Sequence, residues 1–147
     1  MTMHLDESHP DNTLVLDRLR ARRPNRAPIA PPESETYAYT QLGCHPDIVE
    51  RIWDAINPQL PGDSRAVVYA TPALVQPRTG LVIAIGYGTR YALRLPAALV
   101  DEAIARGCST TQTWSGGGMS DVAAECGDGW LFGNWLADEA VWLSHWW

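Results

Sequence analysis

Lysine is absent from this sequence, and several kinds of chemistry are excluded with it. All 11 basic residues other than histidine are arginines. A Schiff-base mechanism, a pyridoxal-bound lysine and the lysine of a phosphate-binding loop all need an ε-amino group. None of these functions is therefore open to this chain.

Cysteine is scarce and widely spaced, which excludes a disulfide framework and a paired-cysteine zinc site. The three cysteines are Cys44, Cys108 and Cys126, and we expect them to be reduced thiols in a cytoplasmic protein. Residues 1–10 lack the apolar stretch of a signal peptide, and no apolar run is long enough to span a bilayer. We expect no membrane contact, no cofactor and no metal centre.

Positive charge is in the minority, since the formal net charge is −6. This balance argues against a nucleic-acid binder, because phosphate contacts need clustered cations. It is compatible with a basic protein partner. The chain has no arginine after Arg106, whereas five acidic residues follow it: Asp121, Glu125, Asp128, Asp138 and Glu139. The C-terminal third is therefore expected to form an acidic surface.

The first 35 residues have few apolar anchors, and we interpret residues 1–35 as a flexible N-terminal arm rich in proline and arginine. Residues 14–19 could form a short helix, but Pro24, Pro28, Pro31 and Pro32 prevent regular structure after it. We expect this arm to be dispensable for folding. Residues 36–147 are then a single globular domain.

Residues 46–95 contain the clearest secondary-structure signals. The spacing of apolar residues predicts a helix over 46–57 with Trp53 in the core and Pro46 at its first position. Segments 66–70 and 81–85 are apolar throughout, which is typical of central strands buried on both faces. The pair Gly88-Thr89 predicts a two-residue turn into a strand over 90–95, with Arg90 and Arg94 facing solvent.

The remaining elements are a helix over 96–107, a strand over 109–114, a short helix over 120–125 and a strand over 130–136. Residues 138–147 form either a closing helix, which the capping residue Asp138 favours, or the second arm of a hairpin. Ile104 is expected on the core face of its helix, and Val141 and Trp142 on one face of the last helix. The fold class is α+β, a two-layer sandwich with a mostly antiparallel sheet of four to five strands and two main helices.

Two short motifs carry little functional weight. Gly86-Tyr87-Gly88 lacks the third glycine and the following helix that a pyrophosphate site requires. Cys44 and His45 are adjacent, and adjacent side chains normally diverge, so they do not make a nucleophile and base by themselves. Neither motif predicts a reaction.

The carboxylates near the C-terminus allow an enzymatic interpretation. Asp121 and Glu125 are four residues apart, and Asp128 follows closely. Grouped carboxylates can act as general acid and base when their pKa values differ. A small hydrolase using these groups with His45 or His145 is therefore one alternative function.

Tryptophan is the least ordinary feature, because five of the seven tryptophans lie between residues 130 and 147. Aromatic side chains beside carboxylates suit an arginine-rich or lysine-rich protein surface. We therefore predict a non-enzymatic protein-binding domain, in its specific form an inhibitor or immunity-type factor that neutralises a basic partner. The predicted binding residues are Asp128, Trp130, Trp135, Asp138, Glu139, Trp142, Trp146 and Trp147. A small-molecule binder with a tryptophan-lined pocket is the other alternative.

Overall fold

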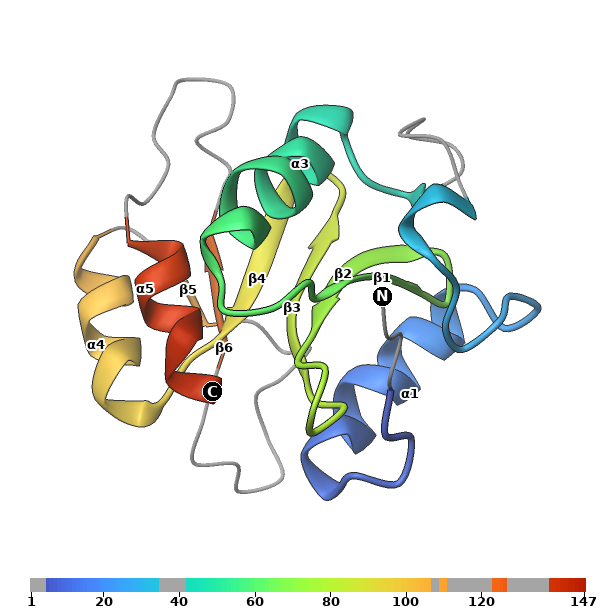
Figure 1. Cartoon of the computed structure of the whole chain (residues 1–147), viewed down its shortest axis with the longest axis horizontal. Helices are drawn as coiled ribbons and strands as arrows, with labels where there is room; N and C mark the ends of the chain where they lie inside the picture. The colour runs from blue at the N-terminus through green and yellow to red at the C-terminus, as the bar shows by residue number, and fades with distance from the viewer. Residues whose placement is uncertain (1–4, 35–41, 107–108, 111–122, 127–137) are drawn as a thin grey trace.

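An antiparallel β-sheet forms the centre of the molecule in the computed structural model, which describes residues 5–34, 42–106, 109–110, 123–126 and 138–147 (Figure 1). Within these residues the sheet has six strands in the order β1-β2-β3-β4-β6-β5, and every neighbouring pair is antiparallel. The strands are β1 (Arg65–Val68), β2 (Thr71–Val75), β3 (Val82–Tyr87), β4 (Arg90–Arg94), β5 (Ser109–Thr110) and β6 (Ala123–Cys126). The predicted α+β class with a mostly antiparallel sheet is confirmed.

Two tight turns fix the register of the first four strands. The turn Gly88-Thr89 joins β3 to β4 so that Tyr87 faces Arg90, as predicted. The turn between β1 and β2 places Tyr69 and Ala70 at φ angles of 46° and 59°. Such two-residue hairpins usually carry glycine or asparagine. Neither residue type marks this turn, and β2 was not predicted.

One face of the sheet is covered by helices from the middle and the end of the chain. The first is α3 (Pro46–Glu50), which continues as a π-helix (Arg51–Ile56) and a 3-10 turn (Asn57–Gln59). The others are α4 (Ala97–Ala105) and α5 (Glu139–Leu143), and α5 continues as the 3-10 turn Ser144–Trp146. The predicted helices over 46–57, 96–107 and 138–147 are therefore confirmed. Trp53, at 1% exposure, lies in the core of this face, and its indole N–H donates to the Ala73 carbonyl at 3.0 Å.

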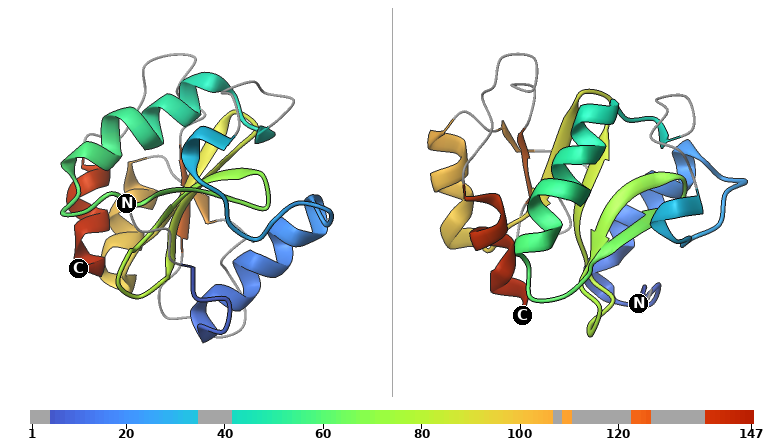
Figure 2. Two further views of the ribbon diagram at one scale, coloured as in Figure 1. Left: turned by 45° about the vertical axis from the view of Figure 1, so that its right-hand side comes forward. Right: turned by 45° about the horizontal axis from the view of Figure 1, so that its top comes forward.

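The opposite face of the sheet is covered by α1 (Thr13–Arg22), which lies on the other side from α3, α4 and α5 (Figure 2). Val15, Leu16 and Leu19 of α1 pack in a second hydrophobic core with sheet residues that include Val82 and Ile85. A two-layer description therefore leaves out the layer that α1 forms. The interpretation of this segment as a flexible arm was wrong for residues 5–34, while the predicted boundary at 35–36 lies at the edge of the described residues.

Polar contacts hold the same N-terminal segment to the sheet. The buried Asn12 donates through Nδ2 to the carbonyls of Asp6 and Gly80, both at 2.8 Å, and accepts from the backbone N–H of Val82 at 2.9 Å. Arg94 is fully buried and donates to the carbonyls of Val82 and Asp11 at 2.7 and 2.8 Å. The prediction that Arg94 faces solvent was wrong, because α1 and the turn before it cover that face.

The edges of the sheet also differ from the sequence-based expectation. Strand β1 stands at one end of the strand order, although it was predicted to be central. Ala30 pairs with it, through reciprocal backbone hydrogen bonds to Val67 of 2.8 and 2.9 Å. Next to the other edge strand, β5, Ala123–Cys126 forms strand β6, so the predicted helix over 120–125 was wrong for these residues. The predicted strand over 130–136 lies outside the described residues.

Candidate functional site

The predicted binding residues fall into two groups. Asp128, Trp130 and Trp135 lie outside the described residues. Asp138, Glu139, Trp142, Trp146 and Trp147 belong to α5 and its flanks. The structure gives these five residues different environments, and only part of the predicted acidic-aromatic surface remains available to a partner.

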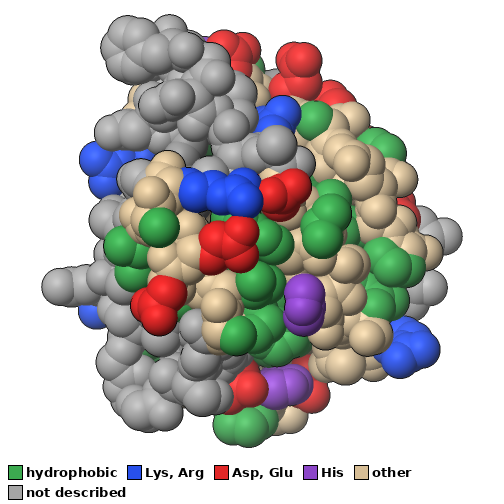
Figure 3. Space-filling view, turned by 90° about the vertical axis from the view of Figure 1, so that its left-hand side faces the viewer, with side chains coloured by type: hydrophobic (Ala, Val, Ile, Leu, Met, Phe, Trp, Pro, Cys, Tyr) green, Lys and Arg blue, Asp and Glu red, His purple; other side chains and the backbone are tan. Residues whose placement is uncertain are grey.

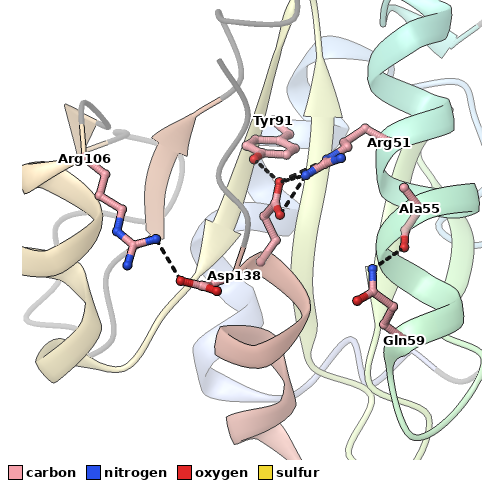
Figure 4. A network of polar contacts seen from close by, with 7 residues as sticks. Arg51, Ala55, Gln59, Tyr91, Arg106 and Asp138 are labelled. Carbon is pink, nitrogen blue, oxygen red and sulfur yellow. Dashed lines mark hydrogen bonds and ion pairs between the residues drawn. The ribbon is translucent and has the colours of Figure 1, made fainter. Parts of the chain in front are cut away.

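Glu139 is buried at 2% exposure and forms the centre of a polar network (Figure 4). Its carboxylate accepts from Arg51 Nη2 at 2.8 Å and Nε at 3.0 Å, and from the hydroxyl of the buried Tyr91 at 2.7 Å. These contacts join α5 to the π-helix and to β4. Glu139 was predicted to be a binding residue. That prediction was wrong, because the carboxylate is buried and is hydrogen-bonded inside the protein.

The three tryptophans of α5 and its flank are also not freely exposed. Trp142 is 4% exposed and belongs to the core. Trp146 and Trp147 are partly buried and pack against the same core, and the Trp146 indole N–H donates to the Arg94 carbonyl at 2.8 Å. The prediction for Trp142 was therefore wrong. Trp146 and Trp147 keep partial exposure and can contribute only their outer edges to an interface.

Asp138 remains at the surface, where it takes part in an ion-pair chain with α4. Arg106, at the end of α4, donates to Asp138 at 2.8 Å and to Glu102 at 2.9 Å. The hydrogen bond with Asp138 is the largest cause that raises the pKa of Arg106 above its ordinary value. The same guanidinium lies 5.3 Å from the centre of the Trp142 ring, which suits a cation–π contact. Arg106 thus bridges α4 and α5.

Two exposed hydrophobic side chains lie on these same two helices. Ile104 of α4 is 42% exposed and Val141 of α5 is 63% exposed, and they are the large hydrophobic residues that stand out to solvent among the described residues. Ile104 was predicted to face the core, whereas Val141 was only placed on one helix face with Trp142. We name the surface made by Asp101, Glu102, Ile104, Asp138 and Val141 the α4–α5 face; Figure 3 looks onto this side of the molecule, where acidic and hydrophobic side chains lie next to one another.

The chain matches no protein-family model, no curated protein and no solved structure. The chemistry of the described side chains is therefore what bears on function. Within the described ranges, no three His, Cys, Asp or Glu side chains come together in a way that could hold a metal ion. None of the helices found there is both long enough and apolar enough to cross a bilayer.

The two histidines named for a hydrolase have local roles. His45 caps α3, where its Nδ1 accepts from the Asp47 backbone N–H at 3.1 Å. His145 Nδ1 lies 3.2 Å from the Trp142 carbonyl, one turn earlier in the same helical run. Of the carboxylates, Asp121 and Asp128 lie outside the described residues, and only the backbone of Glu125 is described, in β6. The hydrolase interpretation therefore gains no geometric support from these contacts.

Cys44 is fully buried behind α3, beside the β3–β4 turn. Burial raises the pKa of its thiol from 9.0 to about 12, and the positive charge of Arg22 offsets a smaller part of this effect in the opposite direction. The neutral thiol is therefore favoured at every pH below this value. A buried neutral thiol is a poor nucleophile.

We expect Cys44 to resist alkylation in the native protein. The intact protein is incubated with iodoacetamide at pH 8 and digested, and the Cys44 peptide is quantified by mass spectrometry. Because the thiol is both buried and protonated, we expect this peptide to remain unlabelled until denaturant is added. Native labelling of Cys44 as fast as in denaturant would contradict the buried position.

Proposed function

We propose that this protein is a non-enzymatic binding domain whose α4–α5 face contacts another protein with a basic surface. One observation carries the proposal: the large exposed hydrophobics of the described residues, Ile104 and Val141, lie on two neighbouring helices and are flanked by carboxylates. Apolar anchors inside a polar rim are typical of protein interfaces.

The charge of this face favours a basic partner. Asp101, Glu102 and Asp138 contribute three carboxylates, and Arg106 contributes one guanidinium that is already shared between two of them. The whole chain carries a net charge of −6. Such a surface attracts a cationic partner over long range and speeds encounter at low salt. An inhibitor or immunity-type factor that neutralises a basic enzyme is the specific form that we propose.

The test begins with the purified protein as bait in the lysate of its own host, followed by binding kinetics with the captured protein. We expect Val141→Asp to weaken binding about tenfold or more by speeding dissociation, because a charge replaces an apolar anchor. The double change Asp101→Arg and Glu102→Arg is expected to slow association and to flatten its salt dependence. All of these side chains are exposed, so the melting temperature should stay close to that of the parent protein.

Glu33→Arg is the matched control, because Glu33 is exposed and lies in the turn Pro32–Ser34, far from α4 and α5 in Figure 1. It changes the net charge by the same amount per residue without touching the α4–α5 face. Equal losses of binding from Glu33→Arg and from the α4–α5 variants would contradict the proposal. So would a failure to capture any partner together with a catalytic turnover that Asp121→Asn or Glu125→Gln abolishes.

A further inference from the structure

A cavity of about 670 Å³ lies between α1 and the β3–β4 turn, on the face of the sheet opposite α3. Its described lining residues are Arg18, Leu19, Ala21, Arg22, Gly43, Ile85, Tyr87 and Gly88. Two of these are arginines and none is acidic, although the chain as a whole has a net charge of −6. The described lining of this cavity is therefore positively charged, on a protein that is acidic as a whole.

The two arginines of the cavity repel each other, and neither pairs with a carboxylate of the described residues. Arg18 and Arg22 are four residues apart on the helix, where like charges repel each other. Arg20 of the same helix pairs with Asp17 at 3.0 Å, whereas Arg18 has no ion-pair partner within the described part of the chain. Arg22 lies over the Tyr87 ring at 5.6 Å and has no described carboxylate partner. These side chains are available to an anion.

The backbone of Gly88, at the end of the cavity, is already hydrogen-bonded within the protein. The Gly88 N–H donates to the Gly43 carbonyl at 2.8 Å, and the Gly88 carbonyl accepts from the His45 N–H at 2.7 Å. A Cβ at Gly43 would meet Nη2 of Arg23 at 3.0 Å and Nη2 of Arg22 at 3.4 Å. The guanidinium groups thus lie directly against this glycine, and recognition of an anion would fall to the arginine side chains.

The other described residues that line the cavity are mainly apolar. Leu19 and Ile85 are buried at 1% and 0% exposure, and Tyr87 adds an aromatic ring at the side. A volume of about 670 Å³ falls in the range of about 300–1,000 Å³ that is usual for small-molecule sites. It is far larger than an inorganic phosphate needs. The ligand that fits is an anionic group joined to an apolar, preferably flat, body.

We propose that this cavity binds a small organic anion, with its carboxylate or phosphate held by Arg18 and Arg22 and its apolar body against Leu19, Ile85 and Tyr87. Guanidinium groups bind both kinds of anion by paired hydrogen bonds. This site is on the opposite face of the sheet from the α4–α5 face, so the inference is independent of the proposed function. Either can fail without the other.

The test is titration calorimetry of the full chain with 2-naphthoate, 2-naphthyl phosphate, the neutral 2-naphthamide and inorganic phosphate. We expect at least one naphthyl anion to bind about tenfold more tightly than both the amide and inorganic phosphate, because a charged hydrogen bond and an apolar wall act together. The stronger of the two anions identifies the head group. Binding of neither anion above the level of the amide would overturn the proposal.

The variants Arg18→Gln and Arg22→Gln locate the binding on α1. Each is expected to weaken the preferred anion about tenfold, because each removes a charged donor. Arg20→Gln is the matched control, since it removes the same charge from the same helix outside the cavity lining. An equal loss in Arg20→Gln would show that binding depends only on the general charge of the helix, and would overturn the site. All three side chains are exposed, and melting curves verify that the variants stay folded.

Discussion

Deletion of residues 1–34 is expected to abolish cooperative unfolding. The deletion removes Val15, Leu16 and Leu19, which cover one face of the sheet. It also leaves the fully buried Arg94 without its contact to the Asp11 carbonyl. Exposing the apolar face of the sheet that α1 covers costs more than a domain of this size can tolerate. The measurement is thermal and urea denaturation of the truncated chain, followed by circular dichroism.

Point variants separate the packing of α1 from general effects of truncation. Leu19→Ala is expected to lower the free energy of unfolding by about 2–5 kcal/mol, as buried leucines do. Asn12→Ala should cost about 1–3 kcal/mol, because it leaves the buried N–H of Val82 unsatisfied. Asp17→Ala, on the exposed side of the same helix, is the control and should cost less than about 1 kcal/mol. A truncated chain that unfolds cooperatively with unchanged stability would show that α1 is not part of the fold.

Glu139→Ala is expected to destabilise the protein by about 3–5 kcal/mol, because it removes the charged hydrogen bonds by which the buried carboxylate joins α5 to the π-helix and to β4. Arg51 and the Tyr91 hydroxyl both lose their shared partner in this variant. Urea denaturation at pH 7 measures the change. Glu102→Ala provides the comparison, since Glu102 also pairs with an arginine but its side chain is 46% exposed. That variant should cost less than about 1 kcal/mol.

A triple variant, Arg51→Met, Tyr91→Phe and Glu139→Leu, tests the cause of this loss. Replacing a buried charged network by apolar side chains is often far less costly than removing one member. We therefore expect the triple variant to be more stable than Glu139→Ala. If Glu139→Ala costs no more than Glu102→Ala, the network around Glu139 contributes nothing beyond an ordinary surface pair.

Local signals predicted the elements that depend on local chemistry. Pro46 at the start of the first long helix, and the glycine that permits a positive φ of 58° at Gly88, are visible in the sequence alone. The glycine predicts the antiparallel hairpin of β3 and β4, and the helical spacing of apolar residues after Pro46 predicts the burial of Trp53. Strand β2 was missed because Pro72 interrupts its pattern and because Tyr69 and Ala70 adopt turn angles that their residue types rarely take.

The environments of the predicted site residues depend on contacts far apart in the sequence. The partner of Glu139 is Arg51, 88 positions earlier, and no spacing rule connects two such residues. Arg94 follows the alternation of a strand with one wet face, yet α1 covers that face. Ile104 was assigned to the core because apolar residues usually lie there, and a helical stripe does not tell which of its edges stays exposed.

The order in which the chain connects the strands of the sheet affects the order in which the protein folds during synthesis. Strands β1, β2, β3 and β4 pair with their neighbours in the chain, so this meander forms through local contacts that close quickly. The Glu139 carboxylate, by contrast, reaches Arg51 only after α5 has left the ribosome. Until then, the meander has formed, but Arg51 lacks its contact with Glu139 and the apolar surface that α5 covers stays exposed. Apolar surface that is exposed at this stage favours aggregation until α5 docks.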